Sequence, residues 1–492
     1  MPERPRLSIC MIVRDEETML PGLLDGVAGL WDELCVVDTG STDGTAGLLA
    51  AAGADVRALA WNDDFAAARN ASLDMAGGDW ILVLDADERV SPELAEAVRA
   101  LLDDDAAGAA TVRLCNELPH GHRRDARLLR LFRRDPSIRY AHAIHEDPTD
   151  SVRAYLERTG RELRRLDGEL RHLGYVRDVA AARDKRRRDL RLLERSVAAN
   201  PRDWYSRYKI LEQARFWNDR AAWRTAAADT VRAVDAAGPE SLTDFPFLGD
   251  LLVLMARGLH DDPQERLDWL ERWRAPAATS PEYRLECGAL QEACGRGAAA
   301  AREFEACLDL PPAHLAQNVT VRPLLGLCRL AAAAGDVHGA LAFAERALDH
   351  NARDPEGLLA AVSFAAAAGD LPGFVVRHRR RRGDSQELAQ ALLAGGEIGA
   401  ARDMAVRLSA REPAAALGVL VCDLVSGRDS DLEVDLERDE ADAAFEAWLT
   451  ALWDSHRVDL KRAFTTNAAA VTEVFPWLPD WLVARTPASA PA

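Results

Sequence analysis

The chain has 492 residues, 48% of them apolar and 29% charged, which excludes disorder or a fibrous repeat as a description of the whole. At about 100–200 residues per domain, this length predicts two to four domains. The net charge of −19 argues against general nucleic-acid binding, because displacing counterions from phosphates needs a basic surface. No apolar run approaches the roughly 18 residues of a membrane span, and the run at 7–13 is too short for a secretory signal. We therefore expect a cytoplasmic protein.

Charge is distributed unevenly along the chain. Residues 121–200 carry 21 Lys and Arg against 13 Asp and Glu. This excess predicts either a solvated basic helix face or a surface for anionic groups such as diphosphates. The eight cysteines include no C-x-x-C pair, and Cys10 and Cys35 lie in apolar runs, so we expect both to be small core residues.

The first third of the chain alternates strand and helix patterns. Strands are predicted at 7–13, 34–37, 55–59 and 80–84, and helices at 16–30, from a cap at 41–43 to 52, at 63–76 and from 91 onward. This alternation predicts an α/β domain with a Rossmann-like, mainly parallel sheet and helices on both faces. Residues 109–175 are more β-like, with strands expected at 111–115, 128–132 and 166–172. Ligands bind such sheets at the carboxyl ends of the strands, where polar clusters fall at 14–16, 38 and 85–87.

From residue 176 onward the pattern is helical only. The hexapeptide AAAAGD occurs at 331–336 and again at 365–370, an offset that matches the tetratricopeptide period of 34 residues. More degenerate units lie at 217–231, 297–310 and 395–408. The chain is therefore predicted to contain an N-terminal domain over 1–175, an all-α tetratricopeptide-like repeat domain over 176–430, and a helical cap or tail over 431–492. The aromatic residues at 475–482 are expected in a capping core.

Two carboxylates one residue apart form the strongest chemical signal. Asp85 and Asp87 follow the apolar run at 80–84, and residues i and i+2 of an extended segment point to the same side. Such a pair suits a hard divalent cation that is shared with substrate phosphates. Acidic tripeptides elsewhere are often merely solvated, but this one ends the fourth strand of an α/β unit.

Two further segments place polar groups at the same edge. Asp38, at the end of the second strand, can accept a hydrogen bond from the N–H of a heterocyclic base, while Ser41 caps the following helix. Arg69 and Asn70, on the third helix, can hold a phosphate or a base. Taken alone, that helix is also compatible with an ordinary surface helix.

Together the segments LSICMIVRDEE, VVDTGSTDGT, WNDDFAAARN and GDWILVLDADE, between residues 7 and 88, resemble family 2 glycosyltransferases of the GT-A fold; the resemblance extends to about residue 146. It implies inverting transfer of a sugar from a nucleotide-sugar, usually uridine diphosphate (UDP)-linked, with Mn²⁺ or Mg²⁺. Asp38 would contact the uracil, Arg69 the nucleotide, and Asp85 the ribose or the metal. The implied donor-site residues are Val13, Arg14, Glu16, Asp38, Arg69, Asp85, Ala86 and Asp87.

Downstream segments resemble one subset of that family, which is fused to tetratricopeptide-like repeats and includes peptide S-glycosyltransferases of glycosylated bacteriocins. The matching segments are RLFRR at 130–134, AIHE at 143–146, HLGY at 172–175, Asp184-Lys185 and Arg188. Asp189 departs from the Asn expected after Arg188, which puts only a peripheral contact in doubt. Tyr175, Lys185, Arg187 and Arg188 either bind diphosphate or acceptor or solvate a helix.

The resemblance also implies catalytic roles. We favour Glu146 as the general base, since it lies in the His-Glu motif at the acceptor side, with Asp87 as the second catalytic carboxylate. The implied metal ligands are Asp85 and Asp87, with His145 or His172 completing the shell. A histidine in a β-rich segment is equally compatible with a structural role.

Three hypotheses about function remain open from the sequence. The first is a sugar transferase whose repeats hold a peptide or protein acceptor, with a lipid-linked or cell-envelope glycan as the alternative acceptor. The second is a non-catalytic repeat scaffold with a remnant nucleotide-binding domain. The third is a nucleotidyltransferase, which the scarcity of lysine and the absence of a Gly-rich phosphate loop in the first 20 residues disfavour. We expect no nucleic-acid partner, and repeat domains often self-associate, so a homodimer is one expectation.

Overall fold

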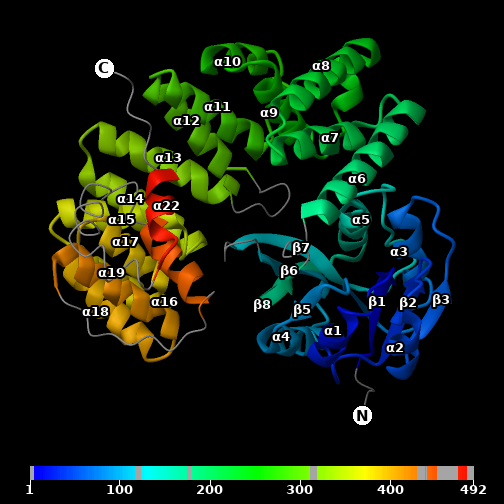
Figure 1. The fold of residues 1–492 in the computed structure, drawn as a ribbon. Helices are drawn as coiled ribbons and strands as arrows, with labels where there is room; N and C mark the ends of the chain where they lie inside the picture. The colour runs from blue at the N-terminus through cyan, green and yellow to red at the C-terminus, as the bar shows by residue number, and fades with distance from the viewer. Residues whose placement is uncertain are drawn as a thin grey trace. The chain divides into compact units, whose positions relative to one another are not determined.

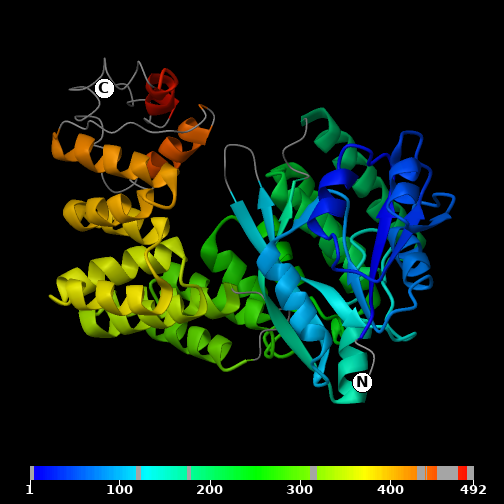
Figure 2. The ribbon, with the colours of Figure 1, turned by 90° about the horizontal axis from the view of Figure 1, so that it is seen from below.

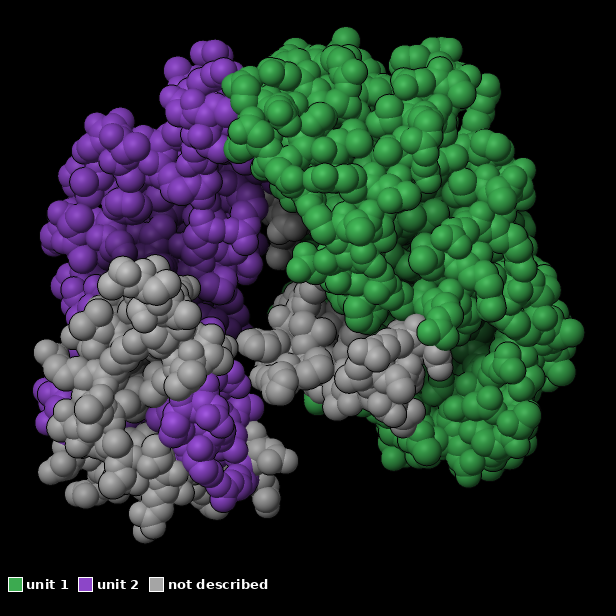
Figure 3. Space-filling model, turned by 45° about the horizontal axis from the view of Figure 1, so that its top comes forward, with its two compact units in different colours: residues 1–277 green, residues 278–492 purple. Residues whose placement is uncertain are grey.

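A computed structural model describes residues 5–117, 123–173, 179–310, 318–428, 438, 440–450 and 475–484. The chain divides into two compact units, residues 1–277 and residues 278–492, coloured separately in Figure 3. Each unit is described by itself.

Unit 1 is built on an eight-stranded sheet in the order β3-β2-β1-β4-β7-β6-β8-β5 (Figure 1). The first four strands in that order are parallel, β7 joins β4 and β6 antiparallel, and β8 runs parallel to β6 and antiparallel to β5. The sheet is therefore mixed, with a parallel half that carries the N-terminal strands. The strands are β1 (Leu7–Val13), β2 (Glu33–Asp38), β3 (Asp55–Ala58), β4 (Trp80–Val83), β5 (Glu88–Val90), β6 (Ala107–Glu117), β7 (Arg123–Arg133) and β8 (Glu162–His172).

Alternating side chains of the central strands enter two separate cores, one on each face of the sheet. Ile9 and Met11 of β1 pack with residues of α1, α2 and α4, whereas Cys10 between them packs with residues of α3 and α5. Buried strands flanked on both sides explain the continuous apolar runs in the sequence. The helices are α1 (Leu20–Gly26), α2 (Thr45–Ala51), α3 (Phe65–Leu73), α4 (Pro92–Leu102) and α5 (Thr149–Thr159).

Unit 1 continues into a helical segment. It comprises α6 (Val179–Ala199), α7 (Trp204–Phe216), α8 (Arg220–Ala237), the 3-10 turn η2 (Pro239–Leu242), α9 (Leu248–Leu259) and α10 (Pro263–Glu271). Ile144, in the segment between β7 and α5, is buried together with Leu192 and Leu193 of α6. The first helices after the sheet are thus packed on the sheet domain, and the predicted boundaries at 175 and 430 stay predictions.

Several local predictions differ from the structure. The helix expected at 16–30 spans only Leu20–Gly26. The next helix begins at Thr45 with Gly44 as its N-cap, so Ser41 does not cap it. Helix α5 was not predicted and lies in the segment 109–175 that was expected to be β-like. The three-residue strand β5 was not predicted either, because it depends on its pairing with β8.

Unit 2 consists of antiparallel helix pairs that stack in chain order (Figure 2). The 34-residue repeat is confirmed: Gly335 and Gly369 both adopt left-handed backbone conformations, with φ of 78° and 73°, in the turn between the two helices of a pair. Glycine is favoured there because a Cβ atom penalises positive φ. The helices are α11 (Pro281–Ala293), α12 (Gly297–Leu308), α13 (Asn318–Ala333), α14 (Val337–His350), α15 (Pro355–Ala367), α16 (Leu371–Arg382), α17 (Gln386–Ala394), α18 (Ile398–Ser409), the 3-10 turn η3 (Pro413–Ala415), α19 (Ala416–Ser426) and α22 (Leu478–Ala484).

Close helix packing in unit 2 depends on glycines. A Cβ atom on Gly288 of α11 or on Gly326 of α13 would lie 2.5 Å or 2.4 Å from the ring of Phe304, so this buried ring fills the space that both glycines leave. The expected capping core is also present. Phe475 stacks on Phe445 at 4.0 Å between ring centroids, and Trp481 is buried in the same cluster. Within the described residues, no helix is long and apolar enough to span a membrane.

Candidate functional site

The loops after β1 and β2 are joined by reciprocal hydrogen bonds. The Asp15 side chain accepts from the Thr42 backbone N–H at 2.7 Å, and the Asp15 N–H donates to Ser41 Oγ at 3.0 Å. Glu16 N–H donates to Thr45 Oγ1 at 2.7 Å. These contacts hold residues 14–17 against the turn at 40–45, which explains why the first helix starts late. The φ of +54° at Asp15 marks the sharp turn that they require.

Asp38 lies at the end of β2, directly opposite Val13 in the parallel register. One of its oxygens, Oδ1, accepts from the backbone N–H groups of Gly40 and Ser41 and from Ser41 Oγ, at 2.8–2.9 Å. The carboxylate is thereby fixed in orientation and almost fully buried. Arg14, by contrast, is exposed and lies 3.8 Å from Asp15.

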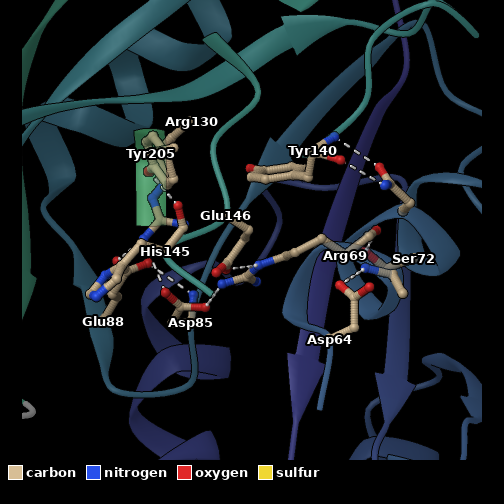
Figure 4. A network of polar contacts seen from close by, with 12 residues as sticks. Asp64, Arg69, Ser72, Asp85, Glu88, Arg130, Tyr140, His145, Glu146 and Tyr205 are labelled. Carbon is tan, nitrogen blue, oxygen red and sulfur yellow. Dashed lines mark hydrogen bonds and ion pairs between the residues drawn. The ribbon is translucent and has the colours of Figure 1, made fainter. Parts of the chain in front are cut away.

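Asp85, which follows β4, is bound by two arginines from different elements (Figure 4). Arg69 of α3 contacts its Oδ1, and Arg130 of β7 lies 3.0 Å from its Oδ2. Burial acts to raise the pKa of Asp85, but the two positive charges outweigh it and hold that pKa well below its usual range. Asp85 is therefore a permanent anion within this network.

Glu88 contacts the backbone of Asp85 and is 1% exposed. It accepts a hydrogen bond from the Asp85 backbone N–H at 2.8 Å, and its Oε1 is 2.6 Å from Arg130 Nη2. Burial raises the pKa of Glu88 to about 7 despite the neighbouring Arg130. The carboxylate of Glu88 thus fixes the turn that carries Asp85 and Asp87.

Arg69 also reaches the segment that carries the predicted base. Its Nε donates to Glu146 Oε1 at 3.1 Å, and its side chain is only 5% exposed. Burial acts to lower the pKa of Arg69, but the charges of Asp85 and Glu146 raise it above the ordinary value. Next to it, the Asn70 amide exchanges two hydrogen bonds of 2.9 Å with the backbone of Tyr140. Asn70 therefore fixes the backbone before Glu146.

Asp87, which directly precedes β5, faces a histidine at the end of the paired strand β8. Its Oδ2 lies 3.2 Å from His172 Nε2, and both side chains remain partly exposed. The antiparallel pairing of β5 with β8 sets Glu88 opposite His172 and so brings these side chains together. A carboxylate oxygen and an imidazole nitrogen at this spacing can share one cation.

His145 occupies a different environment. Its Nε2 is 3.3 Å from Gln213 Nε2, and its carbonyl accepts from the Tyr205 hydroxyl at 2.7 Å, both on α7. Burial lowers the pKa of His145. His142 stacks on Tyr205 at 3.6 Å, and both histidines have positive φ, so α7 supports a tightly bent loop.

The predicted residues thus form one network, one pair and one loop cluster. In the network, Arg69 contacts both Asp85 and Glu146. The pair is Asp87 with His172. The loop cluster contains Val13, Glu16 and Asp38, which lie in or beside the linked loops. Among the described residues, no group of three or more His, Cys, Asp and Glu side chains is arranged to hold a metal ion. In the sequence, Arg130 and Glu88 stand out only as members of matching motifs. The sequence gave no signal for Tyr205 or Gln213, because their contacts are with residues distant in the chain.

Comparison with known proteins identifies the sheet domain. Residues 8–153 match the family model described as glycosyl transferase family 2. The chain contains a family 2 glycosyltransferase domain. That domain holds every predicted donor-site residue and Glu146, whereas His172 lies beyond the matched range.

Relatives in sequence match parts of the chain. A TPR repeat-containing protein of Synechococcus elongatus is 42% identical over 202 residues, which are 41% of this chain and 50% of the relative. An uncharacterized glycosyltransferase of Rickettsia typhi is 31% identical over 93 residues, 19% of this chain and 32% of the relative. The glycosyltransferase SunS of Bacillus subtilis is 27% identical over 152 residues, 30% of this chain and 35% of SunS. The matched part of this chain spans half or less of the length of these relatives.

Solved structures align with parts of the chain. Glucosyl-3-phosphoglycerate synthase from Mycobacterium tuberculosis, in complex with Mn²⁺, UDP and phosphoglyceric acid, aligns with a TM-score of 0.28 at 18% identity, covering 34% of this chain and 71% of that one. The pilus biogenesis factor PilW aligns with a TM-score of 0.32 at 14% identity, covering 43% and 93%. With TM-scores this low, neither alignment supports a functional assignment.

Proposed function

We propose that this chain transfers a sugar from a nucleotide-sugar, UDP-linked, to a peptide or protein acceptor, with inversion at the anomeric carbon. The observation that carries the proposal is the convergence of Asp85, Asp87 with His172, and Glu146 at the carboxyl end of the parallel strands. That edge of the sheet is where α/β folds bind nucleotides. The family 2 domain supports the same reaction class.

The donor would bind across the ends of β1 and β2. Asp38 is oriented by three hydrogen bonds to its Oδ1, which leaves Oδ2 outside those contacts as an acceptor for a base N–H. The linked loops at 14–17 and 40–45 hold Val13, Arg14 and Glu16 beside it. A carboxylate whose orientation is fixed in advance binds a base without losing side-chain entropy on binding.

The metal would be held by Asp87 and His172, and a bound divalent cation would stabilise the negative charge of the departing diphosphate. Mg²⁺ prefers oxygen ligands only, so the imidazole of His172 favours Mn²⁺. Both carboxylate oxygens of Asp85 contact arginines, and the His145 ring lies against Gln213. We therefore assign neither Asp85 nor His145 to the metal, although the resemblance had included both.

Glu146 would act as the base. The acceptor hydroxyl or thiol loses its proton to the Glu146 carboxylate while its oxygen or sulfur forms the new bond to the anomeric carbon. The bond from that carbon to the diphosphate oxygen breaks, and its electron pair leaves with the nucleoside diphosphate. General-base catalysis of this kind contributes about 10²–10⁴-fold to a rate.

A peptide or protein acceptor is favoured by the helical repeats of unit 2, because stacked repeats present extended binding surfaces. The similarity to a TPR repeat-containing protein supports that choice. A lipid-linked or cell-envelope glycan is the alternative acceptor. The cytoplasmic location and the homodimer stay predictions.

The test is nucleotide-sugar hydrolysis by the purified chain, with UDP-, GDP- and TDP-sugars, in the presence and absence of Mn²⁺. Water can replace the acceptor slowly, so no acceptor has to be known. We expect Mn²⁺-dependent release of UDP that is lost in Asp87→Ala. Pyrophosphate release from UTP and a sugar 1-phosphate, measured in a parallel incubation, would instead identify a nucleotidyltransferase. If no nucleotide is bound or cleaved with any metal, the scaffold hypothesis replaces the proposed enzyme.

A further inference from the structure

Arg69 connects two carboxylates of the proposed site, Asp85 and Glu146. It begins on α3, contacts Asp85 after β4 through Nη2, and donates from Nε to Glu146 in the segment between β7 and α5 (Figure 4). The planar guanidinium offers several N–H donors in fixed directions, so one arginine can hold two carboxylates at a set separation.

Burial separates Arg69 from a bound nucleotide. Its side chain is 5% exposed, and its third nitrogen, Nη1, is itself buried without a hydrogen-bond partner among the described residues. A nucleotide phosphate or base could reach this guanidinium only after Asp85 or Glu146 had moved. This geometry conflicts with a direct nucleotide contact, the role that sequence resemblance implied.

Neighbouring contacts stabilise the clamp that Arg69 forms with Asp85 and Glu146. Arg130 contacts the other oxygen of Asp85 and also Glu88, so Asp85 is held in place independently of Arg69. Asn70, the next residue of α3, fixes the backbone of Tyr140 on the same segment as Glu146. The position of α3 is thereby transmitted to Glu146 through both a backbone and a side-chain contact.

We propose that Arg69 is a positioning residue, which fixes the Glu146 carboxylate against the Asp85 anchor, and that it does not bind the nucleotide. This inference rests on the proposed function, because it assigns Arg69 to the orientation of the proposed base. A displacement of a reacting group by about 1 Å can cost 10²-fold in rate, so loss of the clamp should lower turnover and leave donor affinity unchanged.

The experiment compares Arg69→Gln, Arg69→Lys and Arg139→Gln in the full chain. Arg139 is the matched control: its exposed ion pair with Asp74, at 2.8 Å, connects the end of α3 to the segment before Tyr140 without contacting Glu146. Two quantities are measured for each variant: the kcat of UDP-sugar hydrolysis and the Kd of UDP with Mn²⁺ by calorimetry. Circular dichroism and the Tm establish that each variant is folded.

We expect Arg69→Gln to lower kcat about 100-fold with the Kd of UDP unchanged within about twofold, and Arg139→Gln to alter neither. Arg69→Lys should recover part of the rate, because an ammonium keeps the charge but not the two-carboxylate geometry. If Arg69→Gln does not fold, kcat and the Kd of UDP are measured on Arg69→Lys instead, and a lower kcat with an unchanged Kd supports the proposal. A Kd of UDP that rises as much as kcat falls would overturn the proposal and make Arg69 a nucleotide ligand.

A double variant tests whether Arg69 acts through Glu146. If it does, Arg69→Gln adds little further loss to Glu146→Gln, since the group it positions has already been removed. Multiplied losses would assign Arg69 an independent role and overturn the inference. If the wild-type chain itself neither binds UDP nor hydrolyses any nucleotide-sugar, the proposed function has failed. The wild-type measurements therefore test the proposed function, and the variants test the role of Arg69.

Discussion

At the scale of single residues, the two aspartates of the D-x-D sequence have different partners. Asp85 faces Arg69 and Arg130, which contact both of its oxygens, whereas Asp87 faces His172; both aspartates are partly exposed. Sequence spacing treats the two carboxylates as equivalent. In the structure one contacts two arginines, whereas the other is paired with a histidine.

This difference predicts that Asp87 and His172 set metal affinity. His172→Ala should raise the Mn²⁺ concentration for half-maximal hydrolysis by at least about 10-fold, because loss even of a ligand's supporting partner commonly costs 10–100-fold in affinity. The matched control is His260→Ala, which removes another histidine of unit 1 that lies 3.4 Å from a carboxylate, Glu265, outside the site. An unchanged Mn²⁺ requirement in His172→Ala would remove His172 from the metal site.

At the scale of elements, the sequence predicted the parallel half of the sheet well. Apolar runs at 7–13 and 80–84 correspond to β1 and β4, since strands that are buried on both faces leave a strong local signal. Strand β5 and the support of α7 for the Glu146 loop could not be predicted, because both depend on pairing with distant segments. The same reason applies to the site: Asp38, Asp85 and Asp87 are recognisable from local motifs, but the Arg69–Glu146 contact joins residues 77 positions apart.

The role of α7 can be tested with Tyr205→Phe. Its hydroxyl donates to the carbonyl of His145, a residue with φ of +54°, so the change leaves a partly buried acceptor without this partner in a bent loop. We expect the free energy of unfolding to fall by about 1–3 kcal/mol and hydrolysis to slow, with UDP affinity retained.

Tyr208→Phe is the control for this change. It removes a longer contact of 3.4 Å to Glu212, which lies within α7 itself. Urea unfolding and steady-state hydrolysis measure both variants. Equal losses in the two would contradict a specific role for Tyr205 in supporting the loop.

At the scale of the whole molecule, each unit has its own hydrophobic core. The core residues of unit 1 surround the sheet on both faces, while those of unit 2 lie between stacked helices. A packing defect in one of the helix pairs should therefore destabilise unit 2 without altering the chemistry of the sheet domain.

Gly326→Ala tests this separation. The added methyl group would meet the Phe304 ring at 2.4 Å, and such overpacking costs about 1–3 kcal/mol of stability. Gly399→Ala in α18 is the control, because its added methyl group meets no atom within 4 Å and should stabilise by about 0.4–1 kcal/mol. Thermal unfolding measures both, and UDP affinity should stay constant. A loss of UDP affinity in Gly326→Ala would show that the two units are coupled.

The order in which the site's parts occur along the chain has a consequence for biosynthesis. Among the described strands β5 pairs only with β8, so Asp87 meets its histidine only once residue 172 has left the ribosome. The Glu146 loop acquires its support later still, when α7 has emerged as far as Gln213. A nascent chain shorter than this contains the strands and the D-x-D sequence but not the assembled centre. The proposed cleavage of a nucleotide-sugar would thus be deferred until the first helices beyond the sheet have been translated.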